Sequence, residues 1–276
     1  MNPLLYEQII ATAIREDLGF GDITSESLVN PLQQGTAKIT AKQEGIVAGI
    51  EVAKNVFKLV DPSLNFQASI TDGDKVKPGT TLATISGGTR SILSGERVAL
   101  NFLQRLSGIA TGARRAANTV KDFNCRIVDT RKTTPGLRML EKYAVRVGGG
   151  YNHRFGLFDA VLIKDNHIAA AGGITAAVES ARQKVGHMVK IEVEVEDLVQ
   201  AREALAVQAD IIMFDNMDTT QMAAGVKLVA GRALTEASGN ITLASLAQVA
   251  ATGVNLISLG WLTHSAPALD LSLKLF

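Results

Sequence analysis

Positive charge is concentrated between residues 131 and 164, in a chain that is otherwise nearly neutral. The whole chain has 28 Lys plus Arg and 27 Asp plus Glu. Within this stretch the acids are Glu141 and Asp159, whereas the basic residues are Arg131, Lys132, Arg138, Lys142, Arg146, Arg154 and Lys164. A guanidinium group offers a planar fork to a carboxylate or phosphate, and an ammonium group offers a compact charge. The mixture predicts a site for a small polyanion.

Part of this cluster has a simpler explanation. Arg138, Lys142 and Arg146 are four residues apart, which is the spacing of one helix face, so we expect them on a solvated helix surface. The other basic residues fit that explanation less well, because they flank glycine turns and strand ends. They are Arg131, Lys132, Arg154 and Lys164.

Acidic and small residues follow the later predicted strands. Glu194 and Asp215 close two successive strands, and carboxylates in such a position can hold Mg²⁺ together with substrate phosphate oxygens. Glu192 shares a strand face with Glu194, so the pattern leaves open which of the two reaches the site. The segments 238–240 and 258–260 lead into predicted helices, where backbone N–H groups favour phosphate. They follow the last two strands, which is the usual phosphate position in α/β barrels.

An alternation of strands and helices positions these residues. Short apolar or β-branched runs predict six strands, at 126–129, 160–164, 190–195, 210–214, 233–237 and 255–259. Helical patterns lie between them, at 174–184, 196–206, 219–229 and 243–251. Regular spacing without a dinucleotide-type glycine fingerprint favours an α/β barrel over an open doubly wound sheet, and six strands would leave the barrel incomplete.

The first part of the chain has a different pattern. A helix is predicted over 4–18, short strands and turns over 35–86, and a second helix over 91–117 that Ser107–Gly112 interrupts. We therefore expect two domains, an N-terminal α/β sandwich over 1–108 and an incomplete α/β barrel over 109–265. A C-terminal helix over about 266–276 is expected to pack back on the first domain.

Composition excludes several classes of protein. A net charge of +1 provides no field for nucleic acid or an anionic membrane surface. No apolar run reaches the ~18 residues of a membrane span, and the N-terminus does not look like a signal peptide. The single cysteine, Cys125, cannot form an internal disulfide. These features predict a soluble cytoplasmic protein.

The residues above, in this order, resemble the quinolinate phosphoribosyltransferases, also called nicotinate-nucleotide pyrophosphorylases (carboxylating). The resemblance spans almost the whole chain, and its Thr-Arg-Lys-Thr and Asn-His-Arg stretches are specific to a small group of enzymes. The matching stretches are 16–24, 94–111, 129–138, 142–157, 159–167, 191–196, 211–216, 236–242 and 253–265.

The resemblance implies transfer of the phosphoribosyl group of 5-phosphoribosyl 1-pyrophosphate (PRPP) to quinolinate with decarboxylation, in NAD biosynthesis. It implies a homodimer, with higher assemblies open, in which Arg97 reaches the neighbouring subunit's site. Glu194 and Asp215 would lie near the ribose and Mg²⁺. Quinolinate would contact Thr130, Arg131, Lys132, His153, Arg154 and Lys164, and the 5′-phosphate would contact Ser238, Gly239, Asn240, Ser258, Leu259 and Gly260. Of these, Lys132, His153, Lys164, Glu194 and Asp215 are the candidate catalytic residues.

One position differs from the family pattern, and other functions stay open. Trp261 stands where the family pattern predicts a small residue, beside a phosphate loop. A molybdenum-associated homologue is expected to lack parts of the Lys164–His167 stretch. A Schiff-base lyase with Lys164 as the nucleophile and a non-catalytic binding protein are the alternatives. His153 and Lys164 are both candidate proton donors to the decarboxylated ring carbon.

Overall fold

The structure is a computed structural model that describes residues 2–276. It divides into two compact units. Unit 1 comprises Met1–Arg114, Thr133–Gly149 and Leu262–Phe276, and unit 2 comprises Arg115–Lys132 and Gly150–Trp261. Helix α4 (Thr89–Thr119) begins in unit 1 and continues into unit 2.

The predicted interruption of that helix at Ser107–Gly112 is wrong, because α4 runs through it. Gly108 has another use. A Cβ at this position would lie 2.0 Å from the carbonyl oxygen of Pro267. The glycine therefore permits a close approach between α4 and the C-terminal segment, and it does not end the helix. The predicted domain boundary at residue 108 falls within this helix.

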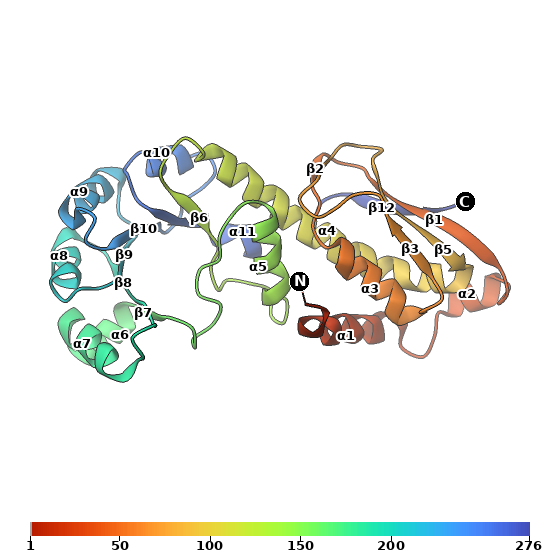
Figure 1. Ribbon diagram of the computed structural model, residues 1–276, viewed down its shortest axis with the longest axis horizontal. Helices are drawn as coiled ribbons and strands as arrows, with labels where there is room; N and C mark the ends of the chain where they lie inside the picture. The colour runs from red at the N-terminus through yellow and green to blue at the C-terminus, as the bar shows by residue number, and fades with distance from the viewer. Residues whose placement is uncertain (1) are drawn as a thin grey trace. The chain divides into compact units, whose positions relative to one another are not determined.

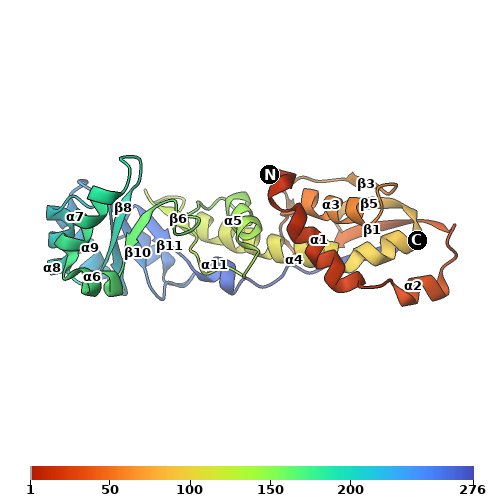
Figure 2. The same ribbon diagram turned by 90° about the horizontal axis from the view of Figure 1, so that it is seen from below.

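Unit 1 contains an α/β sandwich. Its four-stranded sheet has the order β12-β1-β5-β3, with antiparallel pairing throughout, and β2 pairs with β4 beside it. Figures 1 and 2 show α3 against this sheet and α1 alongside α3. The elements of unit 1 apart from α4 are η1 (Pro3–Leu5), α1 (Glu7–Leu18), α2 (Ile23–Leu28), β1 (Gln34–Ala41), β2 (Gly45–Ile46), α3 (Ile50–Val60), β3 (Asn65–Ala68), β4 (Lys75–Val76), β5 (Thr81–Gly88), α5 (Arg138–Val147) and β12 (Leu271–Leu275).

The C-terminal helix predicted over 266–276 is also wrong. Residues 271–275 form β12, which pairs with β1 from Ala37↔Leu275 to Ala41↔Leu271. Leu271, Leu273 and Leu275 alternate with Ser272 and Lys274, which is the period of a strand. The expectation that this segment packs on the first domain is confirmed, since β12 is an edge strand of the unit 1 sheet.

Unit 2 is an incomplete α/β barrel, as predicted. Its six strands are parallel in the order β6-β11-β10-β9-β8-β7, so β6 and β7 are its edge strands. Figure 1 shows helices α7 to α10 outside the curved sheet. The elements are β6 (Arg126–Val128), β7 (Val161–Ile163), α6 (Asp165–Ala171), α7 (Ile174–Lys184), β8 (Ile191–Val195), α8 (Leu198–Ala206), β9 (Ile211–Asp215), α9 (Thr219–Val229), β10 (Leu234–Ser238), α10 (Leu246–Ala250), β11 (Leu256–Ser258) and α11 (Trp261–His264), the last of which passes into unit 1.

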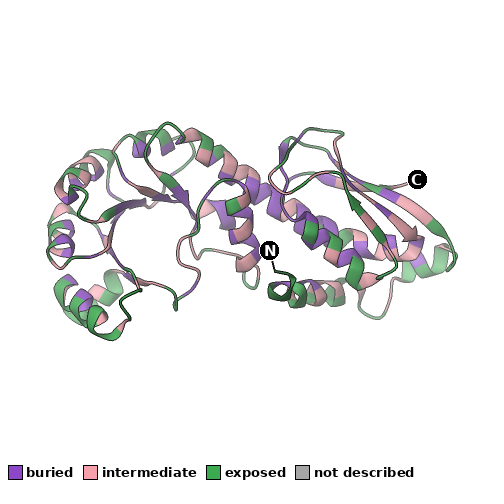
Figure 3. Ribbon diagram, viewed as in Figure 1, coloured by how far each residue is buried: buried purple, intermediate pink, exposed green. Residues whose placement is uncertain are grey.

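Apolar side chains fill the interior of each unit. In unit 1 the buried residues Ala37 and Ile39 of β1 lie opposite Ile85 and Ala83 of β5, under α3. In unit 2 the strands are buried along most of their length, as Figure 3 shows. Among residues 2–276, no helix is both long enough and apolar enough to cross a membrane.

Candidate active site

The polar residues predicted at strand ends gather at one end of the unit 2 sheet, because its strands are parallel. Strands β8, β9 and β10 bring Glu194, Asp215 and Ser238 to their carboxyl ends, and Asp215 lies opposite Ser238 in the strand register. Lys164 follows β7 directly. The carboxyl ends of parallel strands are where barrel enzymes place their active sites.

The segment after Gly149 carries His153 and Arg154 and lies beside the edge strand β6. Tyr151 forms a bridge with Val128, and Asp129 holds the next two residues. The fully buried Asp129 carboxylate accepts hydrogen bonds from Asn152 Nδ2 (2.6 Å) and from the backbone N–H of His153 (2.9 Å). Asp129 ends the strand predicted at 126–129, and its carboxylate fixes this segment.

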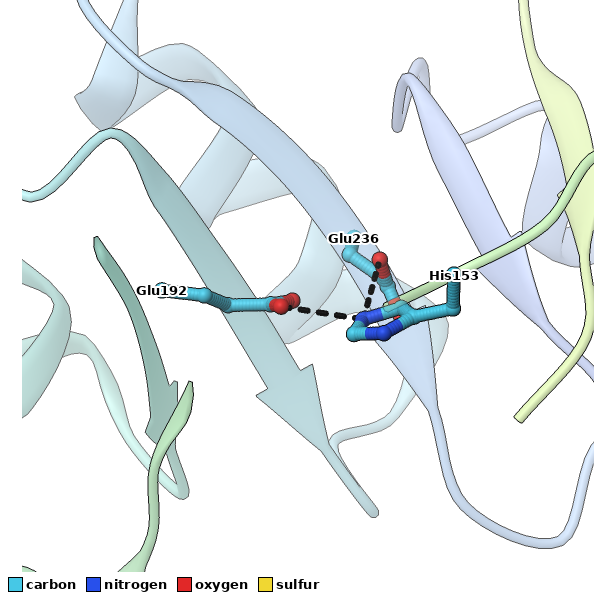
Figure 4. Close-up of side chains that lie close together, drawn as sticks. All are labelled: His153, Glu192 and Glu236. Carbon is cyan, nitrogen blue, oxygen red and sulfur yellow. Dashed lines mark ion pairs between the residues drawn. The ribbon is translucent and has the colours of Figure 1, made fainter. Parts of the chain in front are cut away.

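His153 extends into the barrel interior and meets two buried glutamates, as Figure 4 shows. Its Nε2 atom lies 2.9 Å from Glu192 Oε2 and 3.7 Å from Glu236 Oε2. Its Nδ1 atom accepts a hydrogen bond from the backbone N–H of Arg154 (2.8 Å). Because Nδ1 accepts, the ring proton must be on Nε2.

Strand alternation did not decide which of Glu192 and Glu194 reaches the site. Their depth in the barrel distinguishes them. Glu192 lies inside the barrel and is 3% exposed, whereas Glu194 lies nearer the carboxyl end of β8. Glu236 is fully buried and was missed as a functional candidate. Glu236 could have been found from the sequence, because it stands two residues before Ser238 and therefore on the same face of β10.

Burial raises the pKa of the Glu236 carboxyl to about 8, and the nearby Glu192 carboxylate acts in the same direction. The ligand-type atoms of His153, Glu192 and Glu236 lie within 4.8 Å of one another, which is a spacing that could hold a metal ion. A proton on Glu236 is another way to balance the charge of this cluster.

Arg154 and Arg131 are close enough to repel each other. Burial lowers the pKa of the Arg154 guanidinium, and the charge of Arg131 lowers it further. Arg154 Nη1 donates to the carbonyl oxygen of Ala160 (3.1 Å), while its buried Nε has no hydrogen-bond partner among the described residues. Two guanidinium groups held together in this way form a site suited to an anion.

Lys164 and Glu194 form an ion pair at the barrel mouth. The Lys164 side chain is 44% exposed and the Glu194 side chain is 13% exposed. An ion-paired lysine that is nearly half exposed lacks the buried apolar setting of a nucleophilic lysine, so this arrangement does not favour the Schiff-base alternative. Lys132 is exposed, and its backbone N–H donates to Thr130 Oγ1 (3.0 Å).

The loops after β9 and β10 are packed against each other. Asn240 Nδ2 donates to Asn216 Oδ1 (3.0 Å), and the backbone N–H of Asn216 donates to the carbonyl oxygen of Ser238 (3.0 Å). Asn216 also donates to Asp215 Oδ2 through its side-chain amide (2.7 Å). The predicted phosphate loop at 238–240 therefore lies beside the predicted metal-binding carboxylate Asp215.

The loop after β11, which is predicted to contact the 5′-phosphate, is largely hydrogen-bonded within the protein. The Leu259 side chain is buried, and its backbone N–H donates to the carbonyl oxygen of Val128 (3.0 Å). Ser258 is also buried, with its hydroxyl 3.3 Å from the Ala237 carbonyl oxygen. Gly260 is half-buried. The Trp261 indole N–H donates to the carbonyl oxygen of Ile241 (3.1 Å), which ties this loop to the loop after β10.

Four further basic residues from the sequence analysis belong to unit 1. Arg97 is exposed on α4. Lys142 is only 2% exposed, so the prediction that it lies on a solvated helix surface is wrong, whereas Arg146 of the same helix is exposed and Arg138 is half-buried. The buried Glu141 next to Lys142 pairs with Arg105 (2.8 Å), which shows that this face of α5 is turned inward.

Comparison with known proteins identifies the family. The model of the quinolinate phosphoribosyl transferase N-terminal domain matches residues 22–107, and that of the C-terminal domain matches residues 109–274. The chain belongs to the quinolinate phosphoribosyl transferase family. The predicted resemblance is confirmed.

Several known proteins are similar to this chain over almost its whole length. A Bacillus subtilis (strain 168) protein named "Probable nicotinate-nucleotide pyrophosphorylase [carboxylating]" is 52% identical over 273 residues, covering 99% of this chain and 94% of its own length. The crystal structure of NadC from Streptococcus pyogenes is 43% identical, with a TM-score of 0.97 over 100% of this chain and 98% of its own. The nicotinate-nucleotide pyrophosphorylase from Francisella tularensis is 38% identical, with a TM-score of 0.96 over the same shares.

Proposed function

We propose that this chain transfers the phosphoribosyl group of PRPP to quinolinate and releases pyrophosphate and CO₂, giving nicotinate mononucleotide for NAD biosynthesis. The observation that carries the proposal is the pair of close guanidinium groups, Arg131 and Arg154, at a barrel mouth that also has carboxylates and a glycine loop. A dicarboxylate acceptor needs such a cationic pocket. Family membership and the names of the relatives support the same reaction.

The acceptor pocket is assigned to the basic residues of unit 2. Arg131 and Arg154 would bind the two carboxylates of quinolinate, because a guanidinium matches a carboxylate with two hydrogen bonds. The half-exposed Lys164 and the exposed Lys132 would add charge at the rim, with Thr130 as a hydroxyl donor. These cations lower the repulsion between a dianionic acceptor and a strongly anionic donor before any bond forms.

The donor site is assigned to the carboxyl ends of β8, β9 and β10. Ser238, Gly239 and Asn240 would bind the 5′-phosphate, and the segment Ser258, Leu259 and Gly260 would complete its surroundings. Glu194 and Asp215 would hold Mg²⁺ with PRPP. They fit this ion because both are oxygen ligands on adjacent strands and each keeps solvent-accessible surface. The ion would neutralise part of the charge on the pyrophosphate.

The chemistry proceeds in two steps. The ring nitrogen of quinolinate attacks the anomeric carbon of the ribose, and pyrophosphate leaves with the electron pair of the broken bond. The bond from ring carbon 2 to its carboxylate then breaks, CO₂ leaves, and the carbon keeps the electron pair beside a cationic nitrogen before taking a proton. The protein positions both reactants and balances charge in each step.

The reaction is tested directly with the purified chain. Quinolinate, PRPP and Mg²⁺ should yield CO₂ and nicotinate mononucleotide in equal amounts. Nicotinate in place of quinolinate serves as the matched control, because it lacks the 2-carboxylate. Turnover of nicotinate with inert quinolinate would contradict the proposal.

We also propose a homodimer in which Arg97 enters the partner's acceptor pocket. Arg97 is exposed on α4, and unit 1 exposes large apolar side chains that a partner would cover. These are Leu4, Phe20, Ile23, Leu28 and Leu32, which are 79–113% exposed. A mixture of Arg97→Ala and Arg154→Ala chains should regain activity after subunit exchange, since one of the mixed sites has both arginines. No recovery in a proven heterodimer would contradict the shared site.

A cytoplasmic location is part of the proposal. Burial raises the pKa of the Cys125 thiol, which keeps this half-buried residue in its less reactive form. Fractionation of cells that express the chain would test the location, with membrane or extracellular recovery as the contrary result.

A further inference from the structure

The His153 side chain is held on every side by the protein itself. Its backbone N–H donates to Asp129, its Nδ1 accepts from the Arg154 backbone, and its Nε2 faces Glu192 and Glu236. The side chain is 13% exposed. Neither ring nitrogen is left for an acceptor molecule, which also removes His153 as the proton donor for the ring carbon.

We propose that His153, Glu192 and Glu236 form a brace inside the barrel that positions Arg154, and that His153 serves the acceptor site through Arg154 without touching the acceptor. The inference rests on the proposed function and names three positioning residues for it.

The brace joins parts of unit 2 that are not neighbours in the sheet. His153 belongs to the segment beside β6, which is one edge of the open sheet. Glu192 and Glu236 come from β8 and β10, which lie further along the strand order. Figure 4 shows the carboxyl groups of Glu192 and Glu236 beside the same nitrogen of the His153 ring, Nε2. A contact across the interior therefore fixes an edge segment for which sheet hydrogen bonds alone give only the bridge at Tyr151.

The brace fixes the position of Arg154. Its backbone N–H donates a hydrogen bond to Nδ1 of the His153 ring, and its Nη1 donates to the carbonyl oxygen of Ala160. Asp159 holds the turn between them by accepting from the N–H groups of Phe155 and Gly156 (2.6 and 2.9 Å). The buried Nε of Arg154 has no hydrogen-bond partner among the described residues. At metal sites, loss of a group that orients a ligating residue typically costs about tenfold or more in affinity, and we expect an effect of similar size for Arg154.

The charges of the brace are consistent with this role. The Nε2–H tautomer of His153 is neutral, and a proton on the fully buried Glu236 removes the repulsion between the two carboxyl groups. Glu192 interacts favourably with the Arg154 guanidinium.

Binding measurements test the brace. In isothermal titration with quinolinate alone, Glu192→Leu and His153→Ala should raise the Kd at least about tenfold. In turnover assays, the KM for PRPP should stay within about twofold, because the brace acts on the acceptor side. Glu236→Gln, which imitates the protonated acid, should bind quinolinate better than Glu236→Ala.

Asp210→Asn is the matched control. The Asp210 carboxylate accepts hydrogen bonds from Lys190, Arg182 and the backbone N–H of Ile191. These contacts lie at the amino ends of β8 and β9, so their loss weakens unit 2 away from the barrel mouth. We expect a lower melting temperature with unchanged quinolinate Kd. An equal rise in Kd for Asp210→Asn and Glu192→Leu would overturn the positioning role, as would no rise for Glu192→Leu.

Nuclear magnetic resonance can detect the contacts of the His153 ring without an activity measurement. The chain has four histidines, so the ¹⁵N signals of His153 are assigned by their loss in His153→Ala. We expect the Nε2–H tautomer in the wild-type chain, a changed ring signal in Glu192→Leu, and no change in Nε2 on saturation with quinolinate. A large shift of Nε2 with quinolinate would show direct contact and overturn the proposal, as would a stoichiometric metal ion that is absent from His153→Ala. If the wild-type chain does not bind quinolinate, the proposed function fails, and the comparison with Glu192→Leu still decides whether the brace exists.

Discussion

Gly239 lies against Asn216 so closely that no other residue fits. A Cβ on Gly239 would stand 2.2 Å from Asn216 Oδ1 and 2.8 Å from the Asn216 backbone nitrogen. The backbone φ of Gly239 is +95°, which also favours glycine. The loop that is proposed to bind the 5′-phosphate is thus set by its contact with the neighbouring loop, which begins at the carboxylate of Asp215.

Gly239→Ala should therefore damage PRPP binding. The methyl group must displace Asn216, so we expect the KM for PRPP to rise at least about tenfold, since misplaced binding groups are costly. Steady-state kinetics at saturating quinolinate measure this. Gly231→Ala is the control, because Gly231 has φ +77° but no atom within 4 Å of a Cβ. Equal effects of the two changes would show that backbone strain, and not the contact with Asn216, is responsible.

Trp261→Phe should loosen the two loops that it joins. The change keeps an aromatic ring but removes the N–H that donates to Ile241, and a single hydrogen bond contributes ~1 kcal/mol. We expect the free energy of unfolding to fall by about that amount and the KM for PRPP to rise a fewfold. Urea unfolding and kinetics measure the two effects. A loss of quinolinate affinity with normal PRPP kinetics would contradict this role for Trp261.

Borohydride should not trap Lys164. Its ammonium group pairs with Glu194 and its side chain is 44% exposed, so it lacks the buried apolar setting that activates a lysine nucleophile. Mass spectrometry after treatment with pyruvate and borohydride should find residue 164 unmodified. A reduced adduct at Lys164 that is lost in Lys164→Arg would revive the Schiff-base lyase.

Stability should depend on pH through Glu236. The pKa of this carboxyl is about 8 in the folded chain and has an ordinary value of 4.5. Between these pH values the folded chain keeps a proton that the unfolded chain has released, so the free energy of unfolding falls as pH rises from about 5 to about 8. Glu236→Gln lacks this proton, and its melting temperature should rise relative to wild type over the same range. A constant difference from pH 5 to pH 8 would contradict the raised pKa.

Local sequence patterns were sufficient to predict most elements of the barrel. The helices at 174–184 and 219–229 have the predicted bounds, and each predicted strand agrees within about two residues. Alternation of apolar residues and a polar residue at each strand end carry this information locally. The strand at 271–275 was missed although its leucines alternate, because a short apolar segment reads equally well as a helix until its pairing partner is known.

The burial of individual side chains was less predictable from the sequence, because it depends on which part of the chain packs against them. Lys142 has the same spacing as Arg138 and Arg146 but lies on the inward side of α5. Gly108 reads as a helix breaker, yet the chain segment at Pro267 requires it. In both cases a residue distant in sequence decides the environment.

The sequence by itself determined the family through the resemblance of its motifs. It also determined the barrel and the set of charged residues at the strand ends, because these depend on residue type and local period. Only the tertiary structure decided how that set is divided. It placed Glu194 at the mouth with Lys164 and put Glu192 and Glu236 in the interior with His153. The physical reason is that strand alternation gives a side chain's face, whereas its depth and partners depend on the curvature of the sheet and on the segment that crosses it.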